Sequence, residues 1–108
     1  MRSWYSARLL FESTMDGSPG DDPLREESIR ILLSDGDEAA WIRAKEIGRA
    51  AEHEYVNEAG EMIRWNFVEV LEVQDLCESN LTDGMEVFSR LFHKGDRSMT
   101  ASPKHDLE

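Results

Sequence analysis

The sequence predicts an α+β fold of two layers in the order ββαββ, with one helix on one face of a four-stranded, mostly antiparallel sheet. Three observations predict it. Four stretches are rich in β-branched and aromatic residues, one stretch between them has helical spacing, and segments rich in Gly, Pro, Asp and Ser separate the elements. A chain of 108 residues can bury one core, so we expect a single domain over residues 1–94.

The first two strands are expected at Trp4 to Glu12 and at Glu27 to Leu33. The segment between them, Ser13 to Leu24, reads STMDGSPGDDPL. Its residues supply turn conformations and interrupt strand pairing, so we expect a long loop. Alternation of side chains along the strands predicts that Tyr5 and Ile29 face the helix.

The helix is expected to begin in the acidic segment from Ser34 to Glu38, because its carboxylates suit the positive end of a helix dipole. Residues on the expected inner face recur with helical spacing and are mostly small. They are Ala40, Ala44, Ile47, Gly48, Ala51 and Tyr55. Such a face predicts that the helix backbone lies close to the sheet.

The turn signal Glu58-Ala59-Gly60, with a local Asx turn expected at Asn57, precedes the longest strand-like run, Met62 to Val73. Apolar residues of both parities predict that this run is a central strand. A turn-rich connection then leads to a fourth strand, Met85 to Phe92. Residues 95–108 have no periodicity, so we expect a disordered tail.

Composition limits the partners. Lys and Arg number 12 against 23 Asp and Glu, so the formal charge of −11 disfavours nucleic acid and anionic membrane surfaces and suits a basic protein partner. Cys77 is the only cysteine, so no intramolecular disulfide or thiolate metal cluster is expected. Without a signal-peptide pattern or an apolar run of membrane-spanning length, we expect a cytoplasmic protein.

Four segments carry a further signal: WYSARLLFES (residues 4–13), EESI (26–29), EHEYVNEAGEMIRWNFVEVLEV (52–73) and GMEVFSRLF (84–92). Together they resemble a family of small bacterial proteins catalogued as a domain of unknown function. The chain departs from that pattern at Leu24 or Arg25, where the family has Trp, and at Phe88, where it has Tyr. The resemblance implies a single domain and brings no activity, cofactor or catalytic residue.

Side-chain parity predicts a charged patch on the sheet face opposite the helix. One arginine from each expected strand shares this parity, and glutamates accompany them: Arg8, Arg30, Arg64 and Arg90, with Glu12, Glu72 and Glu86. One interpretation is a ladder of cross-strand ion pairs on a solvated face. The other is an anion or carboxylate site, since guanidinium groups bind such anions with two hydrogen bonds. We favour the ladder, because the carboxylates that would neutralise the arginines are present.

Apolar side chains share the same face, among them Leu32, Val68, Val70 and Phe88. A contiguous apolar patch usually marks an interface, so we expect a homodimer formed through the open sheet face.

Three functions remain open. The favoured one is a small acidic binding or interaction domain without catalytic activity. The second is an immunity-type inhibitor that occupies the basic substrate groove of a toxin. The third is a small enzyme that acts on an anionic substrate through the arginines with Glu12 or Glu86. We expect no catalytic residue, metal site or cofactor, because His53, His93 and His105 lack metal-ligand spacing and no Gly-rich phosphate loop is present.

Overall fold

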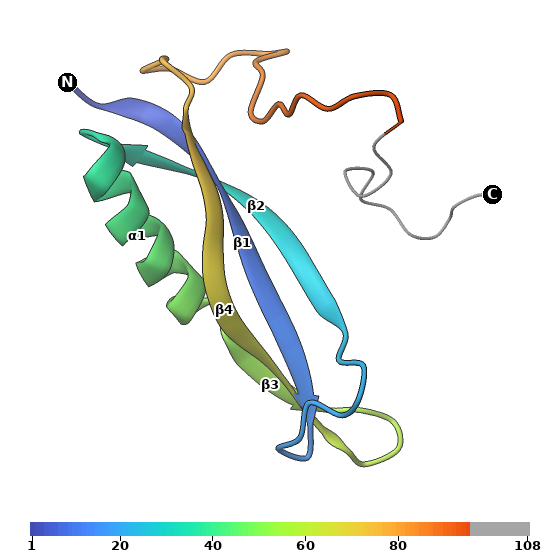
Figure 1. Cartoon of the computed structure of the whole chain (residues 1–108). Coiled ribbons are helices and arrows are strands. Elements are labelled where there is room, and N and C mark those ends of the chain that lie inside the picture. The colour runs from blue at the N-terminus through green and yellow to red at the C-terminus, as the bar shows by residue number, and fades with distance from the viewer. Residues whose placement is uncertain (96–108) are drawn as a thin grey trace.

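The computed structural model describes residues 1–95, which form one helix packed on one face of a sheet (Figure 1). In chain order the elements are β1 (Ser3–Met15), β2 (Arg25–Ser34), α1 (Asp37–Ala50), β3 (His53–Val56) and β4 (Met62–Asp75). The sheet is antiparallel in the order β2-β1-β4-β3. The predicted α+β class and ββαββ order are confirmed. The predicted disordered tail lies, apart from Gly95, outside the described residues.

The core is centred on β1. Its inward side chains Tyr5, Ala7, Leu9 and Phe11 are all buried, with Leu9 fully so. They meet small side chains of α1 on one side and pack beside Leu32 of β2 and Val70 of β4; the helix contributes Ala40 and Ala44. Because β1 pairs with both β2 and β4, it carries the apolar surface that joins the two layers.

The helix lies close to the sheet, as its small inner face predicts. Ala40, Ala44 and Gly48 are its buried residues. A Cβ atom on Gly48 would overlap the Phe67 ring, and Phe67 in turn meets Phe11 edge to face with ring centroids 5.9 Å apart. Glycine at this position therefore permits the approach of α1 to β4.

The prediction that the helical pattern extends to Tyr55 is wrong. The helix ends at Ala50, and residues 53–56 form β3, which pairs with β4 through a tight turn. The Asx turn expected at Asn57 is confirmed, since its Oδ1 accepts hydrogen bonds from the amides of Ala59 and Glu61 at 3.0 and 2.9 Å. The aromatic and β-branched pair Tyr55 and Val56 gains more from strand pairing than from an exposed final helical turn.

The predicted strand from Met85 to Phe92 is also wrong, because this segment has no regular secondary structure. Both edges of β4 are already occupied, by β1 and by β3. The chain instead leaves the end of β4 and crosses toward the side of β1 and β2 (Figure 1). The residues 77–95, here called the C-terminal segment, are held to the sheet at separate points. One is a hydrogen bond from the Trp4 amide to the Glu78 carbonyl at 2.7 Å.

The face predicted for β2 is inverted. Tyr5 is opposite Leu32, so Leu32 and Arg30 lie on the helix side, whereas Ile29 is opposite Arg8 and lies on the other face. Consecutive apolar residues at 31–33 make either parity plausible from sequence, and burial of Leu32 against the core decides between them. In β4, two register shifts against β1 turn Val70 toward the helix, which simple alternation misplaces.

The helix covers only part of the sheet. α1 and β4 both have 14 residues, but a helix rises about 1.5 Å per residue and a strand about 3.3 Å, so α1 spans less than half of β4. The uncovered end holds β3, the β3–β4 turn and the loop between β1 and β2 (Figure 1). A second surface is thus available on the helix side of the sheet.

Candidate functional site

The open face, meaning the face of the sheet away from α1, is centred on Arg8. Its Nη1 donates to Glu27 Oε1 of β2 at 3.2 Å, and its Nη2 donates to Glu72 Oε1 of β4 at 3.1 Å. The Phe88 ring of the C-terminal segment covers the guanidinium, whose carbon lies 5.3 Å from the ring centroid. Arg8 is therefore neutralised from both neighbouring strands and shielded from above.

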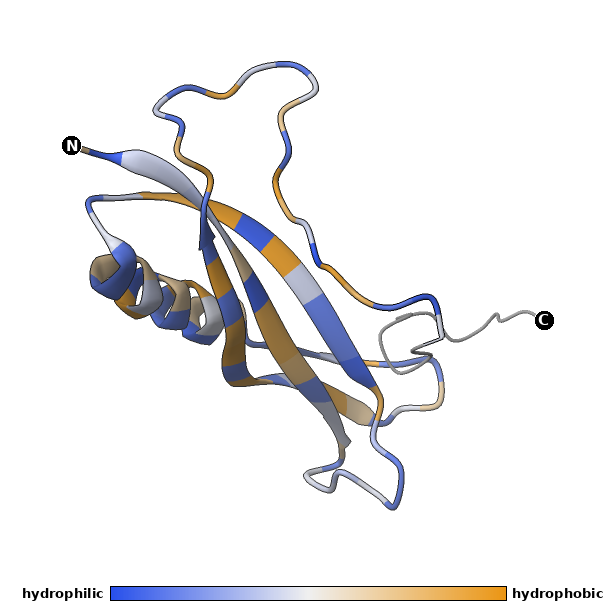
Figure 2. Ribbon diagram, turned by 45° about the horizontal axis from the view of Figure 1, so that its top comes forward, coloured by the Kyte–Doolittle hydropathy of each residue, from blue (hydrophilic) through white to orange (hydrophobic). Residues whose placement is uncertain are grey.

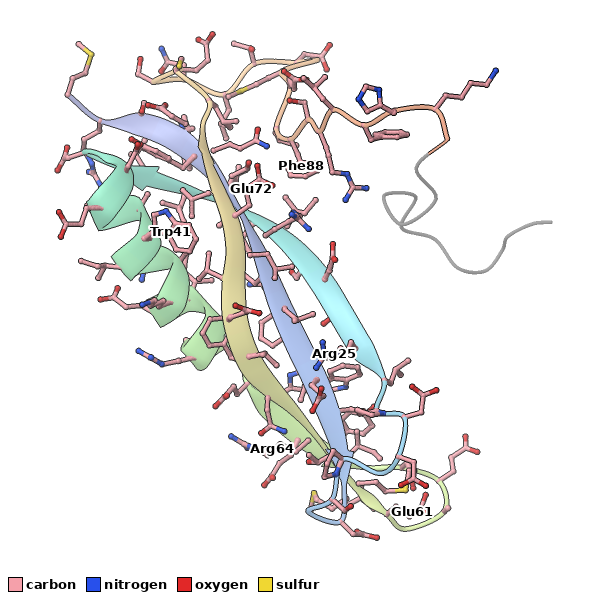
Figure 3. All side chains as sticks on the ribbon, viewed as in Figure 1. Arg25, Trp41, Glu61, Arg64, Glu72 and Phe88 are labelled. Carbon is pink, nitrogen blue, oxygen red and sulfur yellow. The ribbon has the colours of Figure 1, made fainter. Side chains whose placement is uncertain are left out.

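The pKa of Glu72 is lowered by side chains of the sheet and by Arg90 of the C-terminal segment. The hydrogen bond from the Gln74 amide is the main cause, followed by the hydrogen bond and charge of Arg8 and by the charge of Arg90. Gln74 Nε2 also donates to the Ser89 carbonyl at 2.9 Å. Figure 3 shows Glu72 and Phe88 close together where the segment passes over the sheet.

Two further arginines of this face are also paired. Arg25 donates to Glu12 Oε1 at 2.8 Å, directly across the β1–β2 hairpin. Parity alone missed Arg25, although the hairpin register that places it opposite Glu12 could have found it. The side chains of Arg25 and Arg64 come from different parts of the sheet (Figure 3).

Arg64 pairs with Glu52 at 3.2 Å and with Glu54 at 3.7 Å. The other oxygen of Glu52 accepts the Phe67 amide at 2.8 Å. Glu52 thus holds an arginine and a backbone amide beside the register shift of β4. Glu54 lies in β3, whose residues the helical spacing in the sequence predicted to be part of the helix.

The four arginines predicted to share one face do not form one cluster. Arg30 lies on the helix side and donates to Ser28 Oγ at 2.8 Å. Arg8 and Arg64 lie toward opposite ends of the paired strands β1 and β4. Arg8 of β1 is opposite Glu72, and Arg64 of β4 is opposite Thr14. Glu86 is exposed on the C-terminal segment, and Arg90 contributes to the field at Glu72. The open face is a set of separate ion-paired groups, which agrees with the ladder interpretation more closely than with a single anion site.

Two polar atoms of β1 on this face lack hydrogen-bond partners. Ser6 Oγ and Arg8 Nε are buried without a hydrogen bond within residues 1–95. Ser6 and Arg8 are alternate residues of β1, so both side chains project to the open face. Buried polar atoms of this kind are commonly satisfied by ordered water.

Apolar side chains remain exposed at the β2 side of the open face. Ile29 is 47% exposed and Ile31 is 40% exposed. Orange and hydrophilic bands alternate along part of β2 (Figure 2). Within residues 1–95, no backbone hydrogen bond reaches the outer edge of β2.

The uncovered end of the sheet, on the helix side, forms a hollow of about 390 Å³. Its floor comes from β1, β3 and β4, and its wall from the loop between β1 and β2. The principal lining residues are Met15, Asp22, Leu24, Tyr55, Ile63 and Trp65. A hollow of this volume is at the lower end of the range for small-molecule sites.

Residues with metal-binding or nucleophilic chemistry do not gather in the part of the chain described. No group of three or more His, Cys, Asp or Glu residues there could hold a metal ion. Cys77 is exposed and unpaired. His53 lies at the start of β3, near the Ala51 carbonyl and stacked on Tyr55.

The fold and its two surfaces define a small two-layer α+β domain with an ion-paired open face. A family model described as "Domain of unknown function (DUF4288)" matches residues 4–89, and the chain belongs to this family. The match ends within the C-terminal segment, so most of that segment is part of the family domain. No curated protein and no solved structure matches the chain. Among the described residues, no helix has the length and apolar character needed to cross a membrane.

Proposed function

We propose that this protein is a small acidic interaction domain without catalytic activity, and that it forms a homodimer through the β2 side of its open sheet face. The observation that carries the proposal is the exposed pair Ile29 and Ile31 on the edge strand β2, whose outer edge has no backbone partner within residues 1–95. Exposed apolar edge strands are pairing surfaces, and soluble proteins usually protect them.

The orientation of the β2 backbone supports edge pairing. The Ser13 amide donates to the Leu24 carbonyl, and the uninterrupted register of β1 with β2 extends this pattern, so even-numbered residues of β2 bond to β1. The amides and carbonyls of Ile29, Ile31 and Leu33 consequently point outward. An antiparallel dimer with its two-fold axis at Ile31 would bring Ile29 of one copy opposite Leu33 of the other.

The distribution of charge favours self-association at β2 over the other edge of the sheet, β3. Two copies of a chain with charge −11 repel each other, but β2 contains two arginines and two glutamates, which cancel. The opposite edge, β3, has only four residues and includes Glu54. β2 is therefore the longer and electrically neutral edge.

The paired arginines argue against the enzyme alternative. An anionic substrate would have to displace Glu27 or Glu72 from Arg8, or Glu12 from Arg25. Separating these partly exposed pairs costs up to about 1 kcal/mol each, which would weaken binding of the substrate. A site already neutralised by its own carboxylates suits a structural role.

Sedimentation equilibrium tests the dimer at micromolar concentrations. We expect the wild type to sediment as a dimer and Ile31→Asp as a folded monomer. Ile42→Asp is the matched control, because Ile42 is 55% exposed on α1, away from β2, and the change in charge is the same. A monomeric wild type, or equal dissociation by both variants, would overturn the proposal.

A further inference from the structure

The hollow at the uncovered end of the sheet has an aromatic floor. Ser13 of β1 is opposite Trp65 of β4, which is opposite His53 of β3; one step along, Ile63 is opposite Tyr55. Because these positions have the same parity, Trp65 and Tyr55 project to the helix side as diagonal neighbours. Trp65 packs partly against the core, and the His53 ring stacks on one face of Tyr55 with centroids 6.2 Å apart. The other face of Tyr55, which is 48% exposed, and the uncovered part of Trp65 are available to a ligand.

The wall of the hollow is fixed in place by the start of the β1–β2 loop. Asp16 donates its amide to the Met62 carbonyl at 2.8 Å, and its Oδ1 accepts the Met62 amide at 2.9 Å. Met15 and Ser18 exchange two further backbone hydrogen bonds. The loop then returns to β2 with Asp22, Pro23 and Leu24 lining the hollow.

The polar side chains that line the hollow differ in whether they already have hydrogen-bond partners. The Asn57 side chain already makes three hydrogen bonds, since its Nδ2 donates to Glu61 Oε1 and its Oδ1 accepts two backbone amides. The Asp22 carboxylate, the Tyr55 hydroxyl and the Trp65 indole N–H have no hydrogen-bond partner among residues 1–95. The lining includes no Lys, Arg or His. The site therefore offers one free carboxylate and two aromatic rings with no compensating positive charge.

We propose that this hollow binds an arginine side chain presented by an extended segment of a basic protein partner. The guanidinium plane stacks on aromatic rings and its fork of N–H groups matches a carboxylate, so Tyr55, Trp65 and Asp22 together supply the complementary surface. The indole N–H and the phenol hydroxyl can donate to carbonyls of the bound segment. The net charge of −11 favours the approach of a basic partner.

Other ligand classes fit less well. An anion would meet the Asp22 carboxylate with no cation in the lining. A purely apolar ligand would leave that carboxylate beside it without a partner, at a cost in desolvation. The proposed site lies at the end of the sheet on the helix side, so it is separate from the dimer surface and does not depend on it.

The test is titration of ¹⁵N-labelled protein with a blocked pentapeptide that has arginine between pairs of glycines. We expect the indole resonance of Trp65 to shift, while those of Trp4 and Trp41 do not. Replacing arginine with citrulline, its neutral isostere, should weaken binding about fivefold, as expected for loss of one favourable ion pair.

Two substitutions separate a specific contact from general attraction to an acidic protein. Asp22→Asn should weaken binding about fivefold, whereas Asp21→Asn, which removes the same charge outside the lining, should leave the affinity nearly unchanged. Tyr55→Leu should also weaken binding, and Tyr55 is exposed enough for the variant to fold. Equal effects of the two Asp variants, equal binding of the citrulline peptide, or no shift at Trp65 would overturn the proposal.

Discussion

Gly48→Ala tests the close approach of α1 to the sheet. In an exposed helix interior this change stabilises by about 1 kcal/mol, because alanine has the higher helix propensity. Here the new Cβ would overlap Phe67, with the ring carbon Cγ at 2.9 Å. Cγ lies next to the backbone of β4, and Phe11 packs against the ring, so Phe67 cannot rotate away freely. Overpacking of this kind costs about 1–3 kcal/mol, so after the propensity gain of about 1 kcal/mol we expect net destabilisation of up to about 2 kcal/mol.

Urea unfolding measured by circular dichroism gives the free energy of unfolding for the variant and its controls. The difference between Lys45→Ala and Lys45→Gly, at an exposed position inside α1, calibrates the propensity term and should be about 1 kcal/mol. Combining Gly48→Ala with Phe67→Leu should make the alanine less costly than it is with Phe67 present. If Gly48→Ala alone stabilises the protein by the full propensity gain, the close packing described above is wrong.

Two further predictions concern single side chains. Glu72 has a pKa below its ordinary value of 4.5 in the folded protein, so it stabilises the fold above pH 4.5 and this contribution is lost as the pH falls through the lowered pKa. Glu72→Gln should therefore reduce stability by no more than about 1 kcal/mol at neutral pH, since the Arg8–Glu72 pair is partly exposed. The variant should also lose less stability than the wild type as the pH falls. An unchanged dependence of stability on acid pH would contradict this. Asn57→Ala leaves the amides of Ala59 and Glu61 without their acceptor, so it should reduce the free energy of unfolding in urea by about 1–2 kcal/mol. The control Asn80→Ala, at an exposed position, should cost almost nothing. Equal costs would contradict the Asx turn.

The parts of the fold that depend on local pattern could be predicted from sequence. The small inner face of α1, the Asx turn at Asn57 and the strand character of residues 62–73 all follow from the residues themselves. These features require no knowledge of which strands pair. They also make the two-layer class clear without the correct assignment of every strand.

The parts that depend on pairing could not be predicted. Residues 53–56 are too few to distinguish a short strand from the end of a helix, until pairing with β4 is known. The side of β2 that faces the core is fixed by the pairing of Tyr5 with Leu32, and the direction of Val70 by register shifts. The misplacement of Arg30 follows from the first of these.

The hollow illustrates the same limit. Its floor combines Trp65 and Tyr55 from a hairpin that the helical pattern concealed. Its wall comes from a loop whose acidic residues look like ordinary solvated carboxylates in the sequence. The one available signal was that aromatic residues flank the Asn57 turn, which suggests a paired surface only after β3 is recognised.

Amide hydrogen exchange along β2 tests the central claim, that this edge pairs with a second copy. The outward amides of Ile29, Ile31 and Leu33 are compared with those of Ser28 and Arg30, which bond to β1. We expect protection of the outward amides to rise with protein concentration and to disappear in Ile31→Asp, while the inward amides stay protected in both. Fast exchange of the outward amides at every concentration would contradict an interface at β2.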